Sequence, residues 1–97
     1  MIRVVTLSFK QENVGDFLAL FEERKTLIRH FPGCTLLELW QDKDHPNVFY
    51  TYSHWQHPND LENYRVSGLF QDTWTQVKHW FSDAPKAFSS QVMIQLP

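Results

Sequence analysis

The sequence is poor in the residues and patterns that mark several special classes of protein. Its one cysteine, Cys34, cannot form an internal disulfide or a thiolate metal cluster. No hydrophobic run approaches the roughly 18 residues that span a bilayer, and a strand-like segment rather than a secretory signal follows Met1. Lys and Arg number 9 against 11 Asp and Glu, so the chain lacks the positive excess that nucleic-acid phosphates attract. We therefore expect a cytoplasmic domain with no nucleic-acid or membrane partner.

Aromatic side chains, in contrast, are abundant. They make up 15% of the chain, with 8 Phe, 4 Trp and 3 Tyr among 97 residues. A chain of this length forms a single domain, residues 1–97, which can build one modest core. Rings in this number indicate a core, an interface with a partner subunit or a ligand pocket.

Four runs of β-branched, aromatic and apolar residues predict strands. They lie at residues 2–9, 34–41, 48–55 and 86–96. A short polar turn joins the second run to the third, which predicts an antiparallel hairpin.

Two regions between these strands have helical character. Apolar residues recur at helical spacing from Val14 until the turn Phe31-Pro32-Gly33 ends the pattern. A second helical region opens at Pro58, breaks at Ser67-Gly68 and resumes at about Leu69. Its final part carries one apolar stripe, formed by Phe70, Trp74, Val77 and Phe81. The resulting order β-α-β-β-α-β predicts an α+β, ferredoxin-like fold, a four-stranded antiparallel sheet with the helices on one face.

The other face of such a sheet should be polar, but the sequence does not alternate in that way. In the strand at 34–41, Leu37 and Leu39 lie on one side. Leu36 and Trp40 lie on the opposite side. Because an uncovered apolar face of this size is rare on a monomer, we expect a second copy of the chain to cover it. Two sheets packed in this way give a dimeric α/β barrel, whose interior is a natural cavity for a small molecule.

The segment 31–70 carries a succession of local signals that is similar to a known family. They are the turn Pro32-Gly33-Cys34, Glu38, the polar turn Asp42 to Asn47, Trp55, and the pair Ser67 and Phe70. In these features and in its overall order of elements the chain resembles the antibiotic-biosynthesis-monooxygenase-like family of dimeric α/β barrels. The resemblance implies a homodimer that oxygenates an aromatic or quinol-like small molecule without a bound metal or flavin cofactor.

Four positions of this sequence depart from patterns within that family. Many members carry histidines where this chain has Tyr64 and Leu69. The haem-degrading branch uses an Asn, a Trp and a haem-ligating His, which align with Thr6, Tyr64 and Trp74 here. These departures weaken a role in haem degradation, although another histidine could serve as ligand.

Five residues are candidates for the site. His54 occurs on the same strand as two tyrosines, and histidine is the side chain most often used for proton transfer near neutral pH, so it is the candidate general base. Otherwise it is a hydrogen-bonded strand histidine. Tyr64 is the candidate that hydrogen-bonds a phenolic oxygen; otherwise it is an amphipathic residue at a helix rim. Tyr52, Trp74 and Thr6 are candidates for lining the cavity, with roles in the core or in satisfying the backbone as alternatives.

Three functions are consistent with these observations. The first is cofactor-independent monooxygenation of an aromatic or quinol-like molecule. The second is a non-enzymatic small-molecule-binding or stress-related barrel, and the third is a haem-binding or haem-degrading protein. We expect no metal site, because His54 and His57 span the boundary between a strand and a loop and their side chains should diverge.

Overall fold

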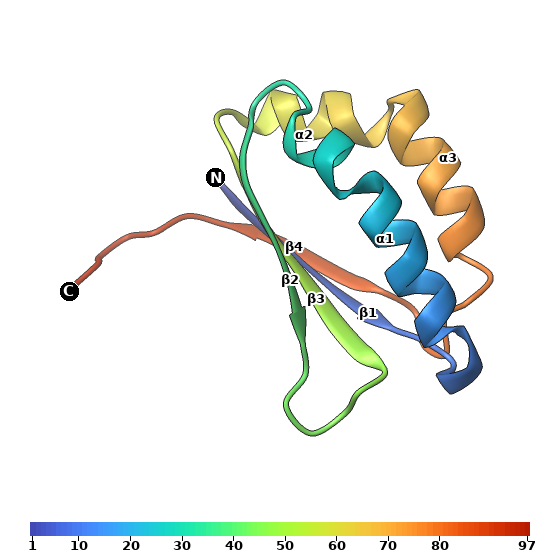
Figure 1. Ribbon diagram of the computed structural model, residues 1–97. Coiled ribbons are helices and arrows are strands. Elements are labelled where there is room, and N and C mark those ends of the chain that lie inside the picture. Colours follow the sequence, from blue (N-terminus) through green and yellow to red (C-terminus); the bar gives the residue numbers. More distant parts are fainter.

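The computed structural model describes residues 1–97 and confirms the predicted order of elements (Figure 1). The strands are β1 (Ile2–Ser8), β2 (Cys34–Gln41), β3 (Val48–Trp55) and β4 (Lys86–Ser90). The helices are the short 3-10 helix η1 (Gln11–Asn13), α1 (Val14–Arg29), α2 (Pro58–Arg65) and α3 (Gly68–Val77). All neighbouring strands are antiparallel in the order β2-β3-β1-β4, which is the predicted ferredoxin-like arrangement. No helix is long and apolar enough to cross a membrane.

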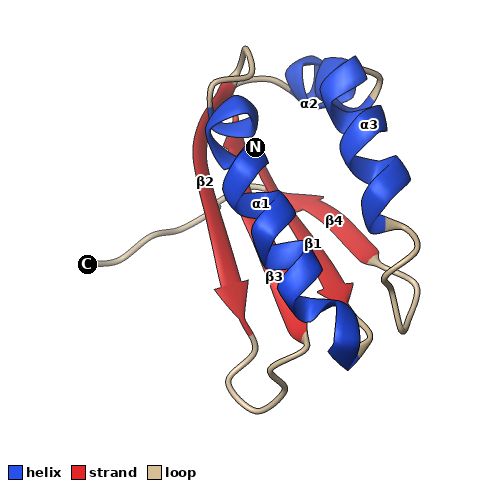
Figure 2. Ribbon diagram, turned by 45° about the vertical axis from the view of Figure 1, so that its right-hand side comes forward, coloured by secondary structure: helices blue, strands red, loops and turns tan.

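All three α-helices cover the same face of the sheet (Figure 2). The strand registers then place each side chain, because successive residues of a strand point to opposite faces. Val5 pairs with Thr51 and Leu7 pairs with Phe49 on the face beneath the helices. The opposite face, which we call the open face, carries Ile2, Val4, Thr6, Ser8, Leu36, Glu38, Trp40, Val48, Tyr50, Tyr52, His54, Lys86, Phe88 and Ser90.

Two clusters of buried side chains hold the helices on the sheet. The larger cluster lies under α1 and is made of Leu7, Phe9, Phe17, Leu20, Phe49 and Val77. The smaller one joins the start of β2, the end of β3 and α2 through Cys34, Trp55 and Leu61. Core burial of this kind is the main favourable contribution to folding.

The turn between α1 and β2 requires glycine. Gly33 has a φ of +90°, and a β-carbon at that position would collide with the Asp60 side chain. That same carboxylate accepts the backbone N–H of His57 at 3.2 Å and so begins α2. The glycine thus allows one turn to pack closely against the start of the next helix.

The prediction that the last helix extends to Phe81 is wrong, because α3 ends at Val77. Past that point the backbone turns back to β1: Lys10 N–H donates to the Trp80 carbonyl and Ser82 N–H donates to the Ser8 carbonyl, both at 2.9 Å. Phe81 therefore reaches the core through a β-bridge with Phe9 rather than from a helix. Phe9 likewise lies in that bridge, so β1 stops one residue short of its predicted end.

The last strand is also shorter than predicted. β4 covers Lys86–Ser90 instead of residues 86–96. Its only neighbour is β1, and Ser90 already pairs with Ile2, the first residue of that strand. Beyond Ser90 no strand remains to pair with, and the segment 91–97 extends away from the sheet (Figure 1).

Candidate functional site

A cavity of about 510 Å³ lies between the helices and the covered face of the sheet. Its floor is formed by helix-facing residues of the sheet, mainly from β1 and β3, with Val5 and Thr51 among them. Its walls are largely aromatic and come from α1, α2 and α3, with Phe21, Phe70 and Trp74 among them. This mostly apolar space is typical in size and character of a small-molecule site. We call it the helix–sheet pocket.

The break between α2 and α3 sets the direction of the aromatic wall. Ser67 caps α3, since its Oγ accepts the Phe70 N–H at 3.2 Å and donates to the Tyr64 carbonyl at 2.6 Å. Phe70 and Trp74 are four residues apart and so share one side of α3. Their rings are nearly parallel, with centroids 6.1 Å apart.

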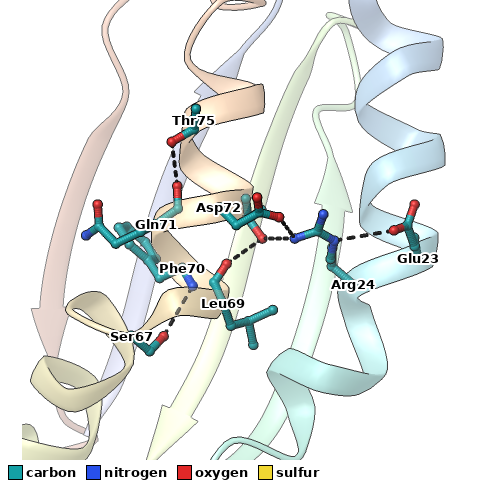
Figure 3. Close-up of polar contacts among 9 residues, drawn as sticks. Glu23, Arg24, Ser67, Leu69, Phe70, Gln71, Asp72 and Thr75 are labelled. Atoms are coloured by element: carbon teal, nitrogen blue, oxygen red, sulfur yellow. Dashed lines mark hydrogen bonds and ion pairs between the residues drawn. The ribbon is translucent and has the colours of Figure 1, made fainter.

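Arg24 links α3, which forms one wall of the pocket, to α1. The Arg24 guanidinium of α1 lies 2.7 Å from the Asp72 carboxylate and donates to the Thr73 hydroxyl at 3.0 Å (Figure 3). Only 13% of the Arg24 side chain is exposed, so the interaction is partly shielded from water. Thr73 is itself a pocket residue, and this contact therefore fixes one wall.

Tyr64 lies within a group of rings at one end of the pocket. It stacks on Trp55 with centroids 5.3 Å apart and meets the edges of Phe31 and Phe70. Burial raises the pKa of Tyr64 to about 12, with a smaller contribution from the nearby Cys34. The phenol therefore stays protonated at neutral pH, where its hydroxyl can donate a hydrogen bond to a ligand.

Two arginines also line the pocket, and sequence reasoning missed both. Arg3 lies on the helix-facing side of β1 and donates to the Ser89 hydroxyl at 3.1 Å. Its pKa is lowered, first by burial and then by the positive charge of Arg65, the second lining arginine. The sequence did contain a signal, because Arg3 is a charged residue on the same side of its strand as the apolar Val5 and Leu7.

The five predicted site residues do not come together. Tyr64 and Trp74 line the helix–sheet pocket. His54, Tyr52 and Thr6 lie on the open face, on the other side of the sheet. Since one layer of backbone separates the two groups, no single small molecule inside the pocket can contact all five.

The open-face residues form a contact network of their own. The Tyr52 hydroxyl lies 2.8 Å from His54 Nε2, and the Trp40 ring stacks on Tyr52 with centroids 4.7 Å apart. Trp40 Nε1 donates to Glu38 at 2.9 Å. The structure brings no three His, Cys, Asp or Glu side chains together as metal ligands.

Comparison with known proteins identifies the family. The family profile described as "Antibiotic biosynthesis monooxygenase" matches residues 1–76. The chain belongs to this monooxygenase family. No match is found among curated protein sequences.

Solved structures of similar fold extend the comparison to the whole chain. A protein from Nitrosomonas europaea whose name places it in the same family has a TM-score of 0.88 at 16% identity, covering 96% of this chain and 98% of that one. A Deinococcus radiodurans protein named in the same way has a TM-score of 0.85 at 20% identity, covering 99% and 97%. A conserved protein from Methanosarcina mazei has a TM-score of 0.84 at 19% identity, covering 90% and 87%. At these identities the likeness concerns the fold.

The family match and the pocket concern almost the same residues. Every lining residue except Val77, Pro85 and Ala87 falls within the matched segment 1–76. Most of the pocket is thus formed by the segment that matches the antibiotic biosynthesis monooxygenase family.

Proposed function

We propose that the protein is a cofactor-independent monooxygenase that acts on an electron-rich aromatic molecule, such as a phenol or quinol, in the helix–sheet pocket. The observation that carries this proposal is an aromatic-walled cavity of about 510 Å³ with the protonated hydroxyl donor Tyr64 in its lining. Family membership supports the reaction class. Fold alone would not, because one fold serves many activities.

The substrate would supply all four electrons that reduce dioxygen. For a hydroquinone, one ring C–H becomes C–OH and the two phenolic groups become quinone carbonyls. One oxygen atom enters the product and the other leaves as water, so one hydroquinone and one dioxygen give one hydroxyquinone and one water. No external reductant is needed for this balance.

The chain's own groups would contribute positioning, a hydrogen bond and exclusion of water. The Tyr64 hydroxyl donates to the substrate's phenolic oxygen and stabilises the negative charge that develops there before oxygen reacts. Trp74 and Phe70 pack against the ring and fix its plane. The apolar lining shelters reactive intermediates from solvent.

Oxygen uptake tests the proposal directly. The purified protein is offered a panel of hydroquinones and polycyclic phenols with a metal chelator present. We expect uptake that the chelator does not change and that Tyr64→Phe lowers about 10- to 100-fold in kcat/KM, because one hydrogen bond to a developing charge is lost. Tyr64→Phe is the informative change since it keeps the ring stack on Trp55 and removes only the hydroxyl.

His54→Gln provides the second arm of the test. On the open face, His54 would act as the base for a substrate bound beside Tyr52 and Thr6. If His54→Gln abolished uptake while Tyr64→Phe left it unchanged, the reaction would belong to the open face and the pocket proposal would be wrong. No uptake from any substrate, with the phenols still bound, would favour the non-enzymatic binding protein.

The haem alternative receives less support from the pocket. None of its lining residues is a histidine, so a haem placed there would find no imidazole ligand. A haem titration without a Soret shift would agree with this composition.

We further infer that a second copy of the chain covers the open face and completes a dimeric α/β barrel. Trp40 and Phe88 are 42% and 57% exposed there. The segment after β4 adds four exposed apolar side chains, Val92, Met93, Ile94 and Leu96. Apolar surface of this extent, together with an extended segment that has no partner strand, is typical of an interface between subunits.

Sedimentation velocity at micromolar concentration tests the dimer. We expect a species of twice the 11.6 kDa chain mass. Phe88→Glu should convert it to the monomer, because the change places a charge within the apolar interface. Leu27→Glu is the matched control: Leu27 is 58% exposed but lies on α1, away from the open face. A monomeric parent protein would contradict the barrel.

A further inference from the structure

The charge of the helix–sheet pocket has one sign. Its lining includes two ionisable basic groups, Arg3 and Arg65, and no Asp or Glu. The remaining lining is apolar, aromatic or neutral polar. The Arg3 charge is partly buried, and partly burying a charge is unfavourable unless it gains a partner.

The Arg3 guanidinium has few hydrogen-bond partners within the protein. It is partly buried on the helix-facing side of β1, where it pairs with Ser89 of β4. A guanidinium has five N–H donors, and the side-chain partner of Arg3 is a single neutral hydroxyl, that of Ser89. No carboxylate lies within ion-pair distance of it, so its charge remains available to a ligand.

Arg65 adds to the same positive field. It closes α2, and the Gln71 side chain holds its backbone carbonyl at 3.0 Å. Its one carboxylate partner is the exposed Glu62 at 3.4 Å. That carboxylate also acts on Arg3, in the direction opposite to Arg65. One solvent-exposed acid facing two guanidinium groups leaves a net positive charge at this end of the pocket, since exposed pairs are weak.

We propose that the helix–sheet pocket selects aromatic carboxylates, with Arg3 and Arg65 binding the carboxylate while Phe70, Trp74 and Tyr64 enclose the ring system. The planar guanidinium matches a carboxylate in a two-pronged geometry, and such charge-assisted hydrogen bonds are stronger than neutral ones. This inference rests on the proposed function only in using the same pocket. It concerns binding and requires no turnover.

Two pairs of isosteric probes distinguish the contribution of the charge to binding from that of the ring system. Anthraquinone-2-carboxylate and anthraquinone-2-carboxamide differ in the charge of one substituent, and naphthalene-2-carboxylate and its carboxamide form a smaller pair. Binding is followed by quenching of tryptophan fluorescence, because Trp55 and Trp74 line the pocket. For each pair that binds, we expect the carboxylate to bind at least about tenfold tighter than its carboxamide at low salt. Raising the salt to screen the charges should reduce this preference.

Three variants assign the preference to residues. Arg3→Gln and Arg65→Gln should each bring the carboxylate towards the affinity of the carboxamide, whose own binding should weaken less because it carries no charge. Lys43→Gln is the control, since it removes the same charge from the exposed turn between β2 and β3. Carboxamide binding that weakens less than carboxylate binding reports an intact pocket. Because Arg65 is exposed, Arg65→Gln provides a second test should Arg3→Gln fold poorly.

Three results would overturn the inference. They are equal binding of carboxylate and carboxamide by the parent protein, an equal loss of both in the arginine variants, and failure of both pairs to bind. The outcome is independent of oxygen chemistry. An arginine-dependent preference without oxygen uptake would keep this inference and reject the monooxygenase, whereas uptake from neutral phenols without any preference would do the reverse.

Discussion

Replacing Arg24 by methionine should loosen α3 from the rest of the protein. Methionine keeps much of the apolar stem and removes the guanidinium that joins α1 to Asp72 and Thr73. Exposed ion pairs contribute at most about 1 kcal/mol, and fully buried charged hydrogen bonds about 1.5–3 kcal/mol. Arg24 is 13% exposed and Asp72 is 64% exposed, so the pair falls near the upper end for exposed pairs, about 1 kcal/mol. The bond to Thr73 adds about 1 kcal/mol, which gives about 2 kcal/mol together.

Urea unfolding followed by tryptophan fluorescence measures this loss, at one protein concentration because a dimer would make stability concentration-dependent. Hydrogen exchange should locate it, with faster exchange of the α3 amides than of those in β1 and β3. Lys25→Met is the matched control on the same helix: its pair with Glu22 at 2.8 Å is exposed on both sides and should contribute less than about 0.5 kcal/mol. If Arg24→Met lost no more stability than Lys25→Met, the idea that Arg24 fastens the pocket wall would be refuted.

Three further predictions concern the turn glycine and the shifted pKa values. In thermal unfolding, Gly33→Ala should destabilise the fold by about 1–3 kcal/mol, because alanine is strained at positive φ and its β-carbon has no space. Gly15→Ala is the control: Gly15 lies in open space on α1, so this change should be neutral or stabilising. The pKa of Tyr64 is raised in the folded state, so stability should fall as the pH rises from about 10 to about 12, and Tyr64→Phe should flatten that part of the unfolding profile. The pKa of Asp42 is lowered to about 2, chiefly by the hydrogen bond from Tyr50, so this carboxylate's stabilising contribution is present above its ordinary pKa and is lost as the pH falls through about 2. Carboxyl NMR should therefore show a higher Asp42 pKa in Tyr50→Phe, and no change would contradict the assignment.

Local patterns in the sequence were sufficient for the order of elements and for the middle strands. The hairpin strands begin and end at the predicted residues, because Cys34 to Gln41 and Val48 to Trp55 are each bounded by strong turn signals. The failures at Phe81 and after Ser90 have a different origin. Phe81 bridges Phe9, just past the end of β1, and β4 pairs only with β1. Both therefore depend on a segment that is distant in the sequence and leaves no local mark.

Local patterns likewise indicated some residues of the candidate site and not others. The helical spacing that relates Trp74 to Phe70, together with the family resemblance for Tyr64, pointed to two residues that do line the pocket. The expectation that His54 would share their cavity assumed one cavity on one face. Alternation along β3 could assign His54 to the same face as Tyr52, but it could not say which face lay under the helices.

The strand registers give the sheet a numerical regularity that bears on how the protein could evolve. The odd-numbered strand residues, such as Arg3 and Ser53, point towards the helices, and the even-numbered ones, such as Tyr52 and Phe88, point to the open face. Cys34 is the exception, because it precedes the register shift at the start of β2 and pairs with a helix-facing residue. A point mutation in the sheet therefore changes a side chain on the helix-facing side or one on the open face. The side chains of one face can therefore change without altering the other face, whereas a one-residue insertion within a strand would exchange the two sets of side chains from that point on.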